Sequence, residues 1–251
     1  MEKIKVPVVI IGAGPAGCCT SYELSNHGIE HVIVEKDKFP RDKICGDALS
    51  GKVLDILEKS KPDLLPELDQ RKDIFIPSPG IRFYGPNEKF VDIPCPPRKD
   101  GLTAGYVTKR IDFDQLLAEN LDANYCRLYQ NASGLSFDKN QTVSFSVGER
   151  DFQIEYDVVI GADGARSKTA EHFVGRISDK DHHSAAVRAY YTNVTGFSNN
   201  FIELHFIKDL LPGYFWVFPL PNNEANVGLG MLSSKVAKNK VNLRARLLDV
   251  V

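Results

Sequence analysis

The sequence of 251 residues lacks several features that mark whole classes of protein. Its five cysteines are odd in number and include no Cys-x-x-Cys pair, which favours reduced thiols in a cytoplasm over a disulfide framework. No apolar run approaches the roughly 20 residues that a membrane span needs, and the apolar run near the N-terminus is too short for a signal peptide. Internal repeats and low-complexity segments are also missing. We therefore expect a soluble α/β protein of the cytoplasm.

A strong charge bias and a pattern of metal ligands are missing as well. The chain has 31 basic and 33 acidic residues, and its net charge of -2 gives no electrostatic reason to bind nucleic acid. The pair His182–His183 lacks the i, i+4 spacing of a helical metal site. We predict neither a nucleic-acid partner nor a metal.

The N-terminal 35 residues carry the strongest pattern in the chain. The β-branched run Val6–Ile11 predicts a strand buried on both faces of a parallel sheet. A G-x-G-x-x-G motif follows it directly, and residues 16–26 can form a helix. A second buried strand over 31–35 then ends in Glu35. The order strand, glycines, helix, strand and acid is typical of a dinucleotide site.

Each part of this pattern has a physical reason. Gly12 permits the tight turn, Gly14 lets the backbone approach a pyrophosphate, and Gly17 lets the helix pack close to the strand. The helix N-terminus offers free N–H groups to the phosphates. Glu35, eighteen residues after Gly17, is placed to accept hydrogen bonds from an adenosine ribose. An acid there disfavours a 2′-phosphate, so FAD or NAD is favoured over NADP at this site.

The sequence downstream distinguishes FAD from NAD. A simple nicotinamide dehydrogenase would continue with regular βαβ units. This sequence instead predicts a helix near 48–59, short antiparallel strands in a segment rich in Pro and Gly, a strand to about Lys109 and a helix from about Asp112. An antiparallel meander over 126–156, with turns at 138–141 and 148–151, precedes a buried strand from residue 157. This order of elements differs from that of a simple nicotinamide dehydrogenase.

Three segments carry a resemblance to a known family. They are "GADG" at Gly161–Gly164, "FPRDKICGDALSG", which contributes Arg41, Lys43, Cys45, Gly46 and Ala48, and "LPGYFWVFPLPNNEANVGLGML" at 211–232. The chain resembles the glutathione-reductase-like FAD fold, and within it the geranylgeranyl reductases of the flavoprotein monooxygenase superfamily. The implied fold is α/β, with a Rossmann-type parallel sheet and an inserted antiparallel sheet of a substrate domain.

The resemblance also implies roles for single residues. Asp163 would contact the flavin-nucleotide chain, Arg110 would lie near the pyrophosphate and adenosine, and Cys45–Gly46 would lie beside the flavin ring. The full set implied to bind the cofactor is Gly12, Gly14, Ala16, Gly17, Glu35, Lys36, Arg41, Cys45, Gly46, Ala48, Arg110, Ala132 and Asp163.

Cys45 is the candidate catalytic residue. Next to Lys43 and an expected helix start, its thiol could have a depressed pKa, which would suit a proton donor or a redox-sensitive thiol. The alternative is that it is a buried small apolar residue, the usual fate of a free cysteine. Gly46 would allow close approach to a flat ring, and the nearby cations would stabilise the anionic reduced flavin.

The aromatic residues Tyr214, Trp216 and Phe218 alternate, so on a strand they share one face. In the reductase family this face walls the cavity above the flavin, and we predict that the three bind substrate. An aromatic core face is the other interpretation. The Trp-x-Trp-x-Ile-Pro motif of the related halogenases is met only in part here, which favours the reductase.

The resemblance divides the chain into two incomplete domains. Residues 1–73 and 101–177 would form the FAD-binding domain, and 74–100 and 178–251 the antiparallel substrate-binding region. Family members continue with a Gly-Asp-Ala-Ala motif that holds the ribitol end of the flavin, and this sequence has no second Gly-Asp-Ala segment. We therefore expect a C-terminally truncated chain with exposed apolar surface and weakened FAD binding.

The implied function is that of an FAD-dependent oxidoreductase. NADPH, NADH or another reductant would reduce the flavin, which would pass hydride to an isolated double bond of a prenyl lipid, with a proton from Cys45 or water. Two alternatives stay open: an FAD-dependent monooxygenase or halogenase that consumes O₂, and an inactive truncated remnant. A lipid substrate would suggest peripheral contact with a membrane, although no basic amphipathic helix requires it.

Overall fold

A computed structural model describes residues 1–99, 101–175, 179, 181–197 and 199–251. The chain forms two compact units, which we describe one at a time. The first consists of Met1–Lys43, Lys59–Pro62 and Ile111–Ile177, and the second of Ile44–Glu58, Asp63–Arg110 and Ser178–Val251. The domain boundaries expected at 100/101 and 177/178 fall on residues 100, 177 and 178, which lie outside the described residues. The expected functional division stays a prediction.

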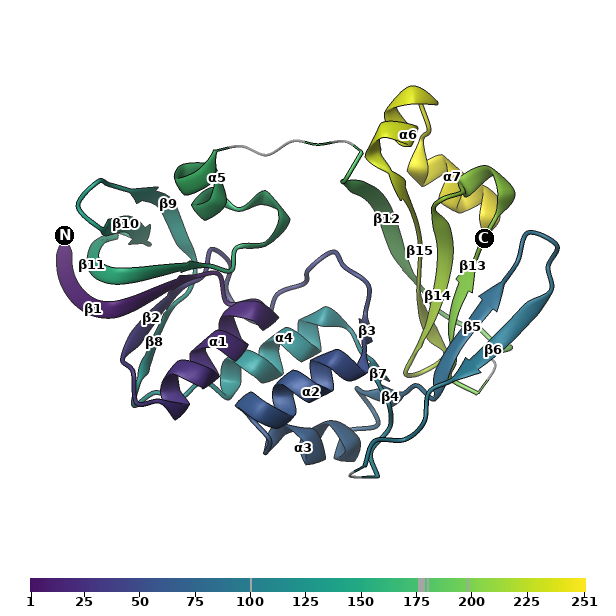
Figure 1. The fold of residues 1–251 in the computed structure, drawn as a ribbon, viewed down its shortest axis with the longest axis horizontal. Coiled ribbons are helices and arrows are strands. Elements are labelled where there is room, and N and C mark those ends of the chain that lie inside the picture. The colour runs from purple at the N-terminus through teal and green to yellow at the C-terminus, as the bar shows by residue number, and fades with distance from the viewer. Residues whose placement is uncertain (100, 176–178, 180, 198) are drawn as a thin grey trace. The chain divides into compact units, whose positions relative to one another are not determined.

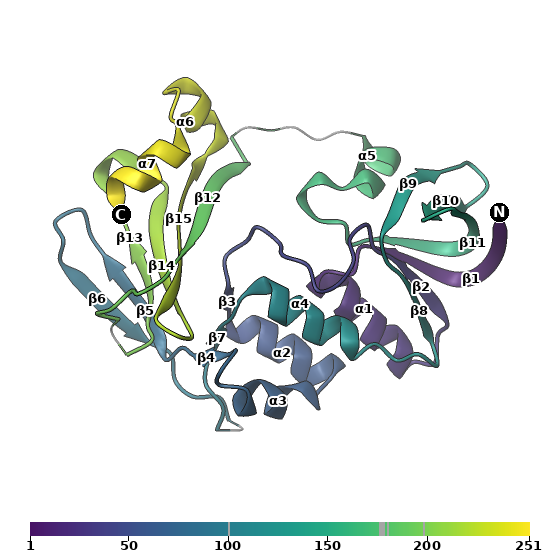
Figure 2. The ribbon, with the colours of Figure 1, turned by 180° about the vertical axis from the view of Figure 1, so that it is seen from behind.

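The first unit is built on a six-stranded sheet in the order β8-β2-β1-β11-β10-β9. Four strands are parallel: β1 (Glu2–Ile11), β2 (His31–Val34), β8 (Cys126–Tyr129) and β11 (Arg150–Gly161). The strands β9 (Ala132–Phe137) and β10 (Thr142–Val147) extend the sheet in antiparallel fashion. Figures 1 and 2 both show β1 beside β11. The predicted Rossmann-type parallel sheet is confirmed.

Two details of the predicted meander are wrong. The segment β8 pairs in parallel with β2 and belongs to the Rossmann-type part of the sheet. The strand β11 is one continuous strand, because it pairs with long β1 along its whole length while its first half also pairs with β10. The buried strand predicted from residue 157 is wrong, since residues 157–161 are exposed or half-buried and Val158 is 52% exposed.

Helices α1 (Pro15–Asn26) and α4 (Arg110–Glu119) lie side by side in the first unit, which contains α4 from Ile111 onward (Figure 1). The hydroxyl of Tyr22 on α1 donates a hydrogen bond of 2.6 Å to the carbonyl oxygen of Leu117 on α4. A third helix, α5 (Lys168–Val174), follows the short 3₁₀ turn Gly164–Arg166. Buried aliphatic and aromatic side chains of β1, β2, β9, β10 and β11 form a hydrophobic core cluster of this sheet.

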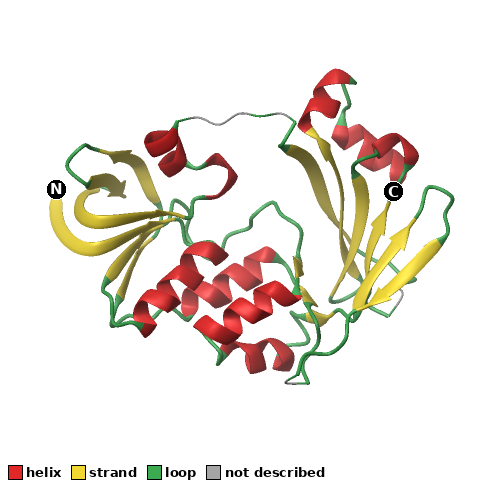
Figure 3. Ribbon diagram, viewed as in Figure 1, coloured by secondary structure: helices red, strands yellow, loops and turns green. Residues whose placement is uncertain are grey.

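The second unit is built on another six-stranded sheet, in the order β12-β15-β14-β13-β5-β6. Its strands are β5 (Gly80–Tyr84), β6 (Phe90–Pro94), β12 (Ser184–Tyr191), β13 (Ile202–His205), β14 (Tyr214–Leu220) and β15 (Glu224–Leu232). All neighbours are antiparallel except β13 and β5. Figure 3 shows α6 (Ser233–Lys238) and α7 (Leu243–Val250) beside this sheet, where α7 packs on β12 and β15. The predicted antiparallel sheet is confirmed.

A small three-stranded sheet, β3-β7-β4, corrects the expected start of the next helix. Ala48–Leu49 form β3, which pairs with β7 (Tyr106–Val107), and β4 (Ile76–Pro77) pairs with the other side of β7. Because the backbone of β3 bonds to β7, helix α2 (Gly51–Ser60) begins only after it, and α3 (Leu64–Gln70) follows. The helix start expected immediately after Cys45–Gly46 is therefore wrong.

Two further observations concern the described part of the chain. Within it, no helix is both long and apolar enough to cross a bilayer. The same residues contain no group of three or more His, Cys, Asp or Glu side chains that could hold a metal ion.

Candidate functional site

The three glycines of the loop after β1 differ in how closely their neighbours approach. Gly12 has a φ of +100°, and a Cβ on it would lie 2.5 Å from the carbonyl oxygen of Ala162. A Cβ on Gly17 would lie 1.9 Å from the carbonyl oxygen of Gly12. A Cβ on Gly14 would meet only the guanidinium of Arg41, at 3.9 Å. Close packing therefore requires Gly12 and Gly17, whereas Gly14 leaves room for a ligand at the N-terminus of α1.

Glu35 lies at the carboxyl end of β2 and is 4% exposed. Its carboxylate accepts hydrogen bonds from the backbone N–H of Ala13, at 2.7 Å, and of Asp37, at 3.0 Å. Arg41 adds an ion pair of 3.5 Å to the same group. The carboxylate therefore fixes the glycine loop to the end of β2. The neighbouring Lys36 points into solvent and pairs with Asp37.

Arg41 lies at the glycine loop of the first unit, and its side chain is only 10% exposed. Its guanidinium donates a 2.7 Å hydrogen bond to Asp114 of α4 and lies over the ring of Phe39. Asp114 is fully buried and was missed from the sequence. The available signal was an acid on the apolar face of a helix, next to Phe113. This pair holds a buried cation beside Gly14.

The remaining predicted cofactor residues occupy different places in the fold. The carboxylate of Asp163 bonds to the hydroxyl of Ser167 and to the backbone N–H of Thr169, at 3.1 Å, so it stabilises the turn into α5. The N–H of Ala132 donates to the carbonyl oxygen of Glu35 at 2.9 Å. Ala16 is an exposed residue of the first turn of α1. Arg110, by contrast, begins α4 and belongs to the second unit.

In the second unit, Cys45 and Gly46 lie in the loop before β3. Cys45 is exposed, so the interpretation of this cysteine as a buried apolar residue is wrong. A Cβ on Gly46 would lie 3.3 Å from the ring of Phe218 on β14. Ala48 is half-buried where β3 begins. The sequence motif around Cys45 therefore meets the aromatic strand near Phe218.

The three aromatic residues of β14 form a continuous row. The ring centroids of Tyr214 and Trp216 are 6.1 Å apart, as are those of Trp216 and Phe218. Tyr214 is 40% exposed, whereas Trp216 and Phe218 are buried. The predicted common face is confirmed.

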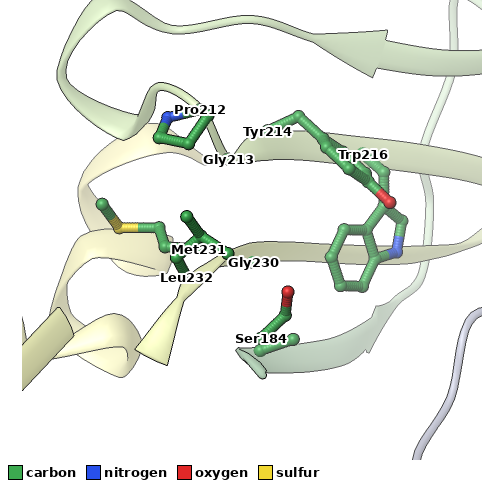
Figure 4. A pocket seen from close by; sticks show the side chains of 9 residues that line it. Ser184, Pro212, Gly213, Tyr214, Trp216, Gly230, Met231 and Leu232 are labelled. Carbon is green, nitrogen blue, oxygen red and sulfur yellow. The ribbon is translucent and has the colours of Figure 1, made fainter. Parts of the chain in front are cut away.

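A pocket of about 400 Å³ opens at the Tyr214 end of this row. Figure 4 shows the rings of Tyr214 and Trp216 on one side of it, with Pro212 and Met231 toward its other end. Phe218 does not line it. The lining residues come from β12, β14, β15 and the turn before β14: Ser184, Ala186, Pro212, Gly213, Tyr214, Trp216, Gly230, Met231 and Leu232. The lining is mostly apolar, as a site for a hydrophobic molecule requires.

A buried polar chain links the loop of Cys45 to the aromatic strand. The indole N–H of Trp216 donates to Asn226 Oδ1 at 2.9 Å, and Asn226 Nδ2 donates to Asp47 Oδ2 at 2.7 Å. Burial raises the pKa of the Asp47 carboxyl, and its hydrogen bond from Asn226 offsets part of that effect. Sequence reasoning missed both Asp47 and Asn226, although each lies inside a motif quoted for the resemblance.

Comparison with known protein families shows which family this chain belongs to. A family profile described as "FAD binding domain" matches residues 5–223, most of the chain. The chain belongs to this FAD-binding domain family. The match includes the glycine loop, Glu35 and the aromatic row of β14.

Relatives of this FAD-binding domain include two reductases. One is the digeranylgeranylglycerophospholipid reductase of Methanococcus vannielii, 28% identical over 90% of this chain and 55% of the relative. Another is the menaquinone reductase of Mycolicibacterium smegmatis, 29% identical over 92% of this chain and 56% of the relative. The chain thus spans little more than half the length of these relatives.

Solved structures share the fold of the FAD-binding domain. A geranylgeranyl bacteriochlorophyll reductase-like protein of Thermoplasma acidophilum matches with a TM-score of 0.77 and 23% identity, over 99% of this chain and 60% of that protein. The myxobacterial chondrochloren halogenase CndH matches with a TM-score of 0.81 and 19% identity, over 99% of this chain and 57% of that protein. These matches establish the glutathione-reductase-like fold and do not separate a reductase from a halogenase.

The residues of the first unit fit FAD. Open space at Gly14, the N-terminus of α1 and the buried guanidinium of Arg41 suit an anionic pyrophosphate. Gly12 and Gly17 hold the turn that creates this space. The carboxylate of Glu35 at the adjacent strand end suits a ribose.

Proposed function

We propose that this FAD-binding chain is part of a reductase that adds hydrogen across carbon–carbon double bonds of a prenyl lipid. The observation that carries the proposal is the mostly apolar pocket of about 400 Å³ at one end of the Tyr214–Trp216–Phe218 row. The loop of Cys45 and Gly46 meets the other end of that row. The names of the two reductase relatives support the same substrate class, since one names a digeranylgeranyl lipid.

In this proposal the residues of the first unit bind the dinucleotide. The N-terminus of α1 and Arg41 bind the pyrophosphate, and Glu35 accepts hydrogen bonds from the ribose. Asp163 holds the flavin-nucleotide chain. Lys36, Arg110 and Ala132 stand near the nucleotide, and Cys45, Gly46 and Ala48 near the flavin ring, as the resemblance implies. FAD, once reduced by NADPH, NADH or another donor, supplies the hydride.

The residues of the pocket position the substrate. An isolated alkene is unactivated, so its orientation and the exclusion of water carry much of the rate. Tyr214 and Trp216, which line the pocket, pack along the prenyl chain, and Phe218 continues the aromatic row toward Gly46. A proton reaches the second carbon from the Cys45 thiol or from water. Delivery of such a lipid implies contact with a membrane surface.

The test is an anaerobic turnover assay on the 251-residue chain. FAD is added, excess is removed by desalting, and the protein is reduced with NADPH, NADH or dithionite. A geranylgeranylated lipid is then added, and mass spectrometry counts the hydrogens gained. We expect one pair of hydrogens for each reduced double bond. If dithionite reduces the bound FAD but NADPH and NADH do not, a nicotinamide is not the electron donor.

Two variants connect the assay to the pocket. Ala186→Leu fills the pocket that Ala186 lines, and we expect it to lower turnover of the geranylgeranyl lipid at least about tenfold. Ala237→Leu makes the same change at an exposed position of α6 and should leave turnover unchanged. A reduced flavin that is not reoxidised by the lipid, with no hydrogens gained by the lipid, would contradict the proposed reaction. A protein that stays colourless after desalting would contradict FAD binding by this chain alone.

A further inference from the structure

The hydrogen bonds between Asp47, Asn226 and Trp216 run in one direction. An indole N–H can only donate, so the oxygen of the Asn226 amide must face Trp216. The amide nitrogen of Asn226 then faces Asp47, whose carboxylate oxygen must accept. All three residues are less than 9% exposed, so each bond is shielded from water. The two neighbours of Asn226 therefore fix the orientation of its amide.

Asp47 also connects these hydrogen bonds to the segment before α4. Its backbone carbonyl oxygen accepts a 2.9 Å hydrogen bond from the N–H of Thr108, which is fully buried. Arg188 and Tyr190 of β12 lie near the Asp47 carboxyl, and Arg188 favours its charged form. Asp47 is thus joined to β15 through its side chain and to the end of β7 through its backbone.

The loop that contains Cys45 and Gly46 runs directly into Asp47. Gly46 lies against the ring of Phe218, while Cys45 is exposed. The residues that Asp47 joins are far apart in the sequence: its bond to Asn226 spans 179 residues. The packing of Gly46 on Phe218 joins the same loop to β14.

We propose that Asp47 is a positioning residue that, through Asn226, holds the Cys45–Gly46 loop against the Phe218 end of the aromatic row. The catalytic meaning of this device rests on the proposed function, in which the loop faces the flavin. The hydrogen-bonded chain itself does not rest on that function. Loss of the hydrogen bond from Asn226 to Asp47 should therefore release the loop whether or not the protein reduces lipids.

Three variants form a cycle that tests the direction of the chain. Asn226→Asp still accepts from Trp216, but as a carboxylate it cannot donate to Asp47, so the exchange is measured at a pH where both carboxyl groups are ionised and repel each other. Asp47→Asn keeps an oxygen that accepts from Asn226. The double variant D47N/N226D reverses the pair, since the new amide at 47 can donate to the new carboxylate at 226.

The rate of hydrogen exchange at the Thr108 amide, which donates to the backbone of Asp47, measures how often the loop is released. We expect Asn226→Asp to speed exchange there by about fivefold to a hundredfold, the change that follows loss of a buried hydrogen bond. In Asp47→Asn the Thr108 amide should exchange nearly as slowly as in the natural protein, and in D47N/N226D slow exchange at Thr108 should be restored. The His31 amide, which donates to Tyr125 in the first unit, is the control for global unfolding and should not change.

Several outcomes would overturn the proposal. They are unchanged exchange at Thr108 in Asn226→Asp, equal acceleration at Thr108 and His31, and no recovery in D47N/N226D. If Asn226→Asp does not fold, the double variant D47N/N226D is the test. The proposal then requires that it fold and show slow exchange at Thr108. If the cycle behaves as expected but no lipid is reduced in the turnover assay, the positioning role holds and the proposed function fails. If all three variants reduce the lipid at the rate of the natural protein, positioning by Asp47 has no effect on the reaction.

Discussion

Glu35 and Asp47 are both buried carboxylates beside a glycine segment, and they are held in opposite ways. Glu35 accepts hydrogen bonds from the backbone N–H of Ala13 and Asp37, and Arg41 neutralises it. Asp47 accepts from the side chain of Asn226, and burial raises the pKa of its carboxyl. The first acid lies in a region supported by its own local backbone, and the second in a region supported by residues far away in the sequence.

This difference explains which acid could be found from the sequence. Backbone donors come with the strand, turn and helix, so the spacing of Gly12, Gly14, Gly17 and Glu35 already determines the arrangement. A side-chain partner such as Asn226 depends on where β15 lies in the folded protein. The following predictions test this contrast, from the largest expected effect to the smallest.

Gly17→Ala should be the most damaging change. Its Cβ would lie 1.9 Å from the carbonyl oxygen of Gly12, so the turn must move. We expect a loss of about 4 kcal/mol in the free energy of unfolding, measured with urea. Gly14→Ala is the matched control, because its Cβ meets nothing closer than 3.9 Å. It should fold normally and lose FAD affinity instead; equal destabilisation by both variants would contradict the division of roles in the glycine loop.

Arg41→Met should come next, because it removes a buried cation from Glu35 and Asp114. We expect the free energy of unfolding to fall by about 3 kcal/mol, the usual cost of breaking a buried ion pair. Urea titrations at low and high salt check this, and salt should matter little because the pair is buried. Lys5→Met breaks the exposed pair with Glu155 and should have little effect. Equal effects of the two variants would be evidence against a buried pair.

Gly228→Ala should disturb the aromatic row of the second unit. Its Cβ would lie 2.3 Å from the indole ring of Trp216, and we expect a loss of about 2 kcal/mol with a shifted emission maximum. Trp216 is the only tryptophan, so fluorescence reports this site alone. Gly230→Ala, whose Cβ would lie 3.9 Å from the same ring, should leave the emission nearly unchanged. An unshifted emission in Gly228→Ala would show that the indole is not confined there.

Asp47→Asn should have the smallest effect, and one that depends on pH. Burial raises the pKa of Asp47 in the folded state, with Asn226, Tyr190 and Arg188 offsetting part of the shift. The folded chain therefore holds this proton more tightly than the unfolded chain, and the natural protein loses stability as pH rises above the ordinary aspartate value. The variant has no such loss, so its stability relative to the natural chain should improve as the pH rises above the ordinary aspartate value of about 4. Urea titrations across this range check it; a constant difference would contradict the raised pKa.

The sequence by itself determined the parts whose structure is local. The glycine loop, the helix after it and the shared face of Tyr214, Trp216 and Phe218 all follow from spacing along the chain. Periodicity and turn chemistry are short-range properties, so they can be read without knowing the fold. The continuous strand β11 and the short strand at Ala48 were missed because pairing partners decide them.

Only the tertiary structure decided the partners of buried polar groups. Asp114 reaches Arg41 across 73 residues, and Asn226 reaches Asp47 across 179. A hydrogen bond depends on distances of a few tenths of an ångström, which sequence spacing does not specify beyond one helix or hairpin. Burial then makes each such partner necessary, because an unsatisfied polar group in the interior is costly. The motifs were visible in the sequence, and the contacts that hold them in place arose from the fold.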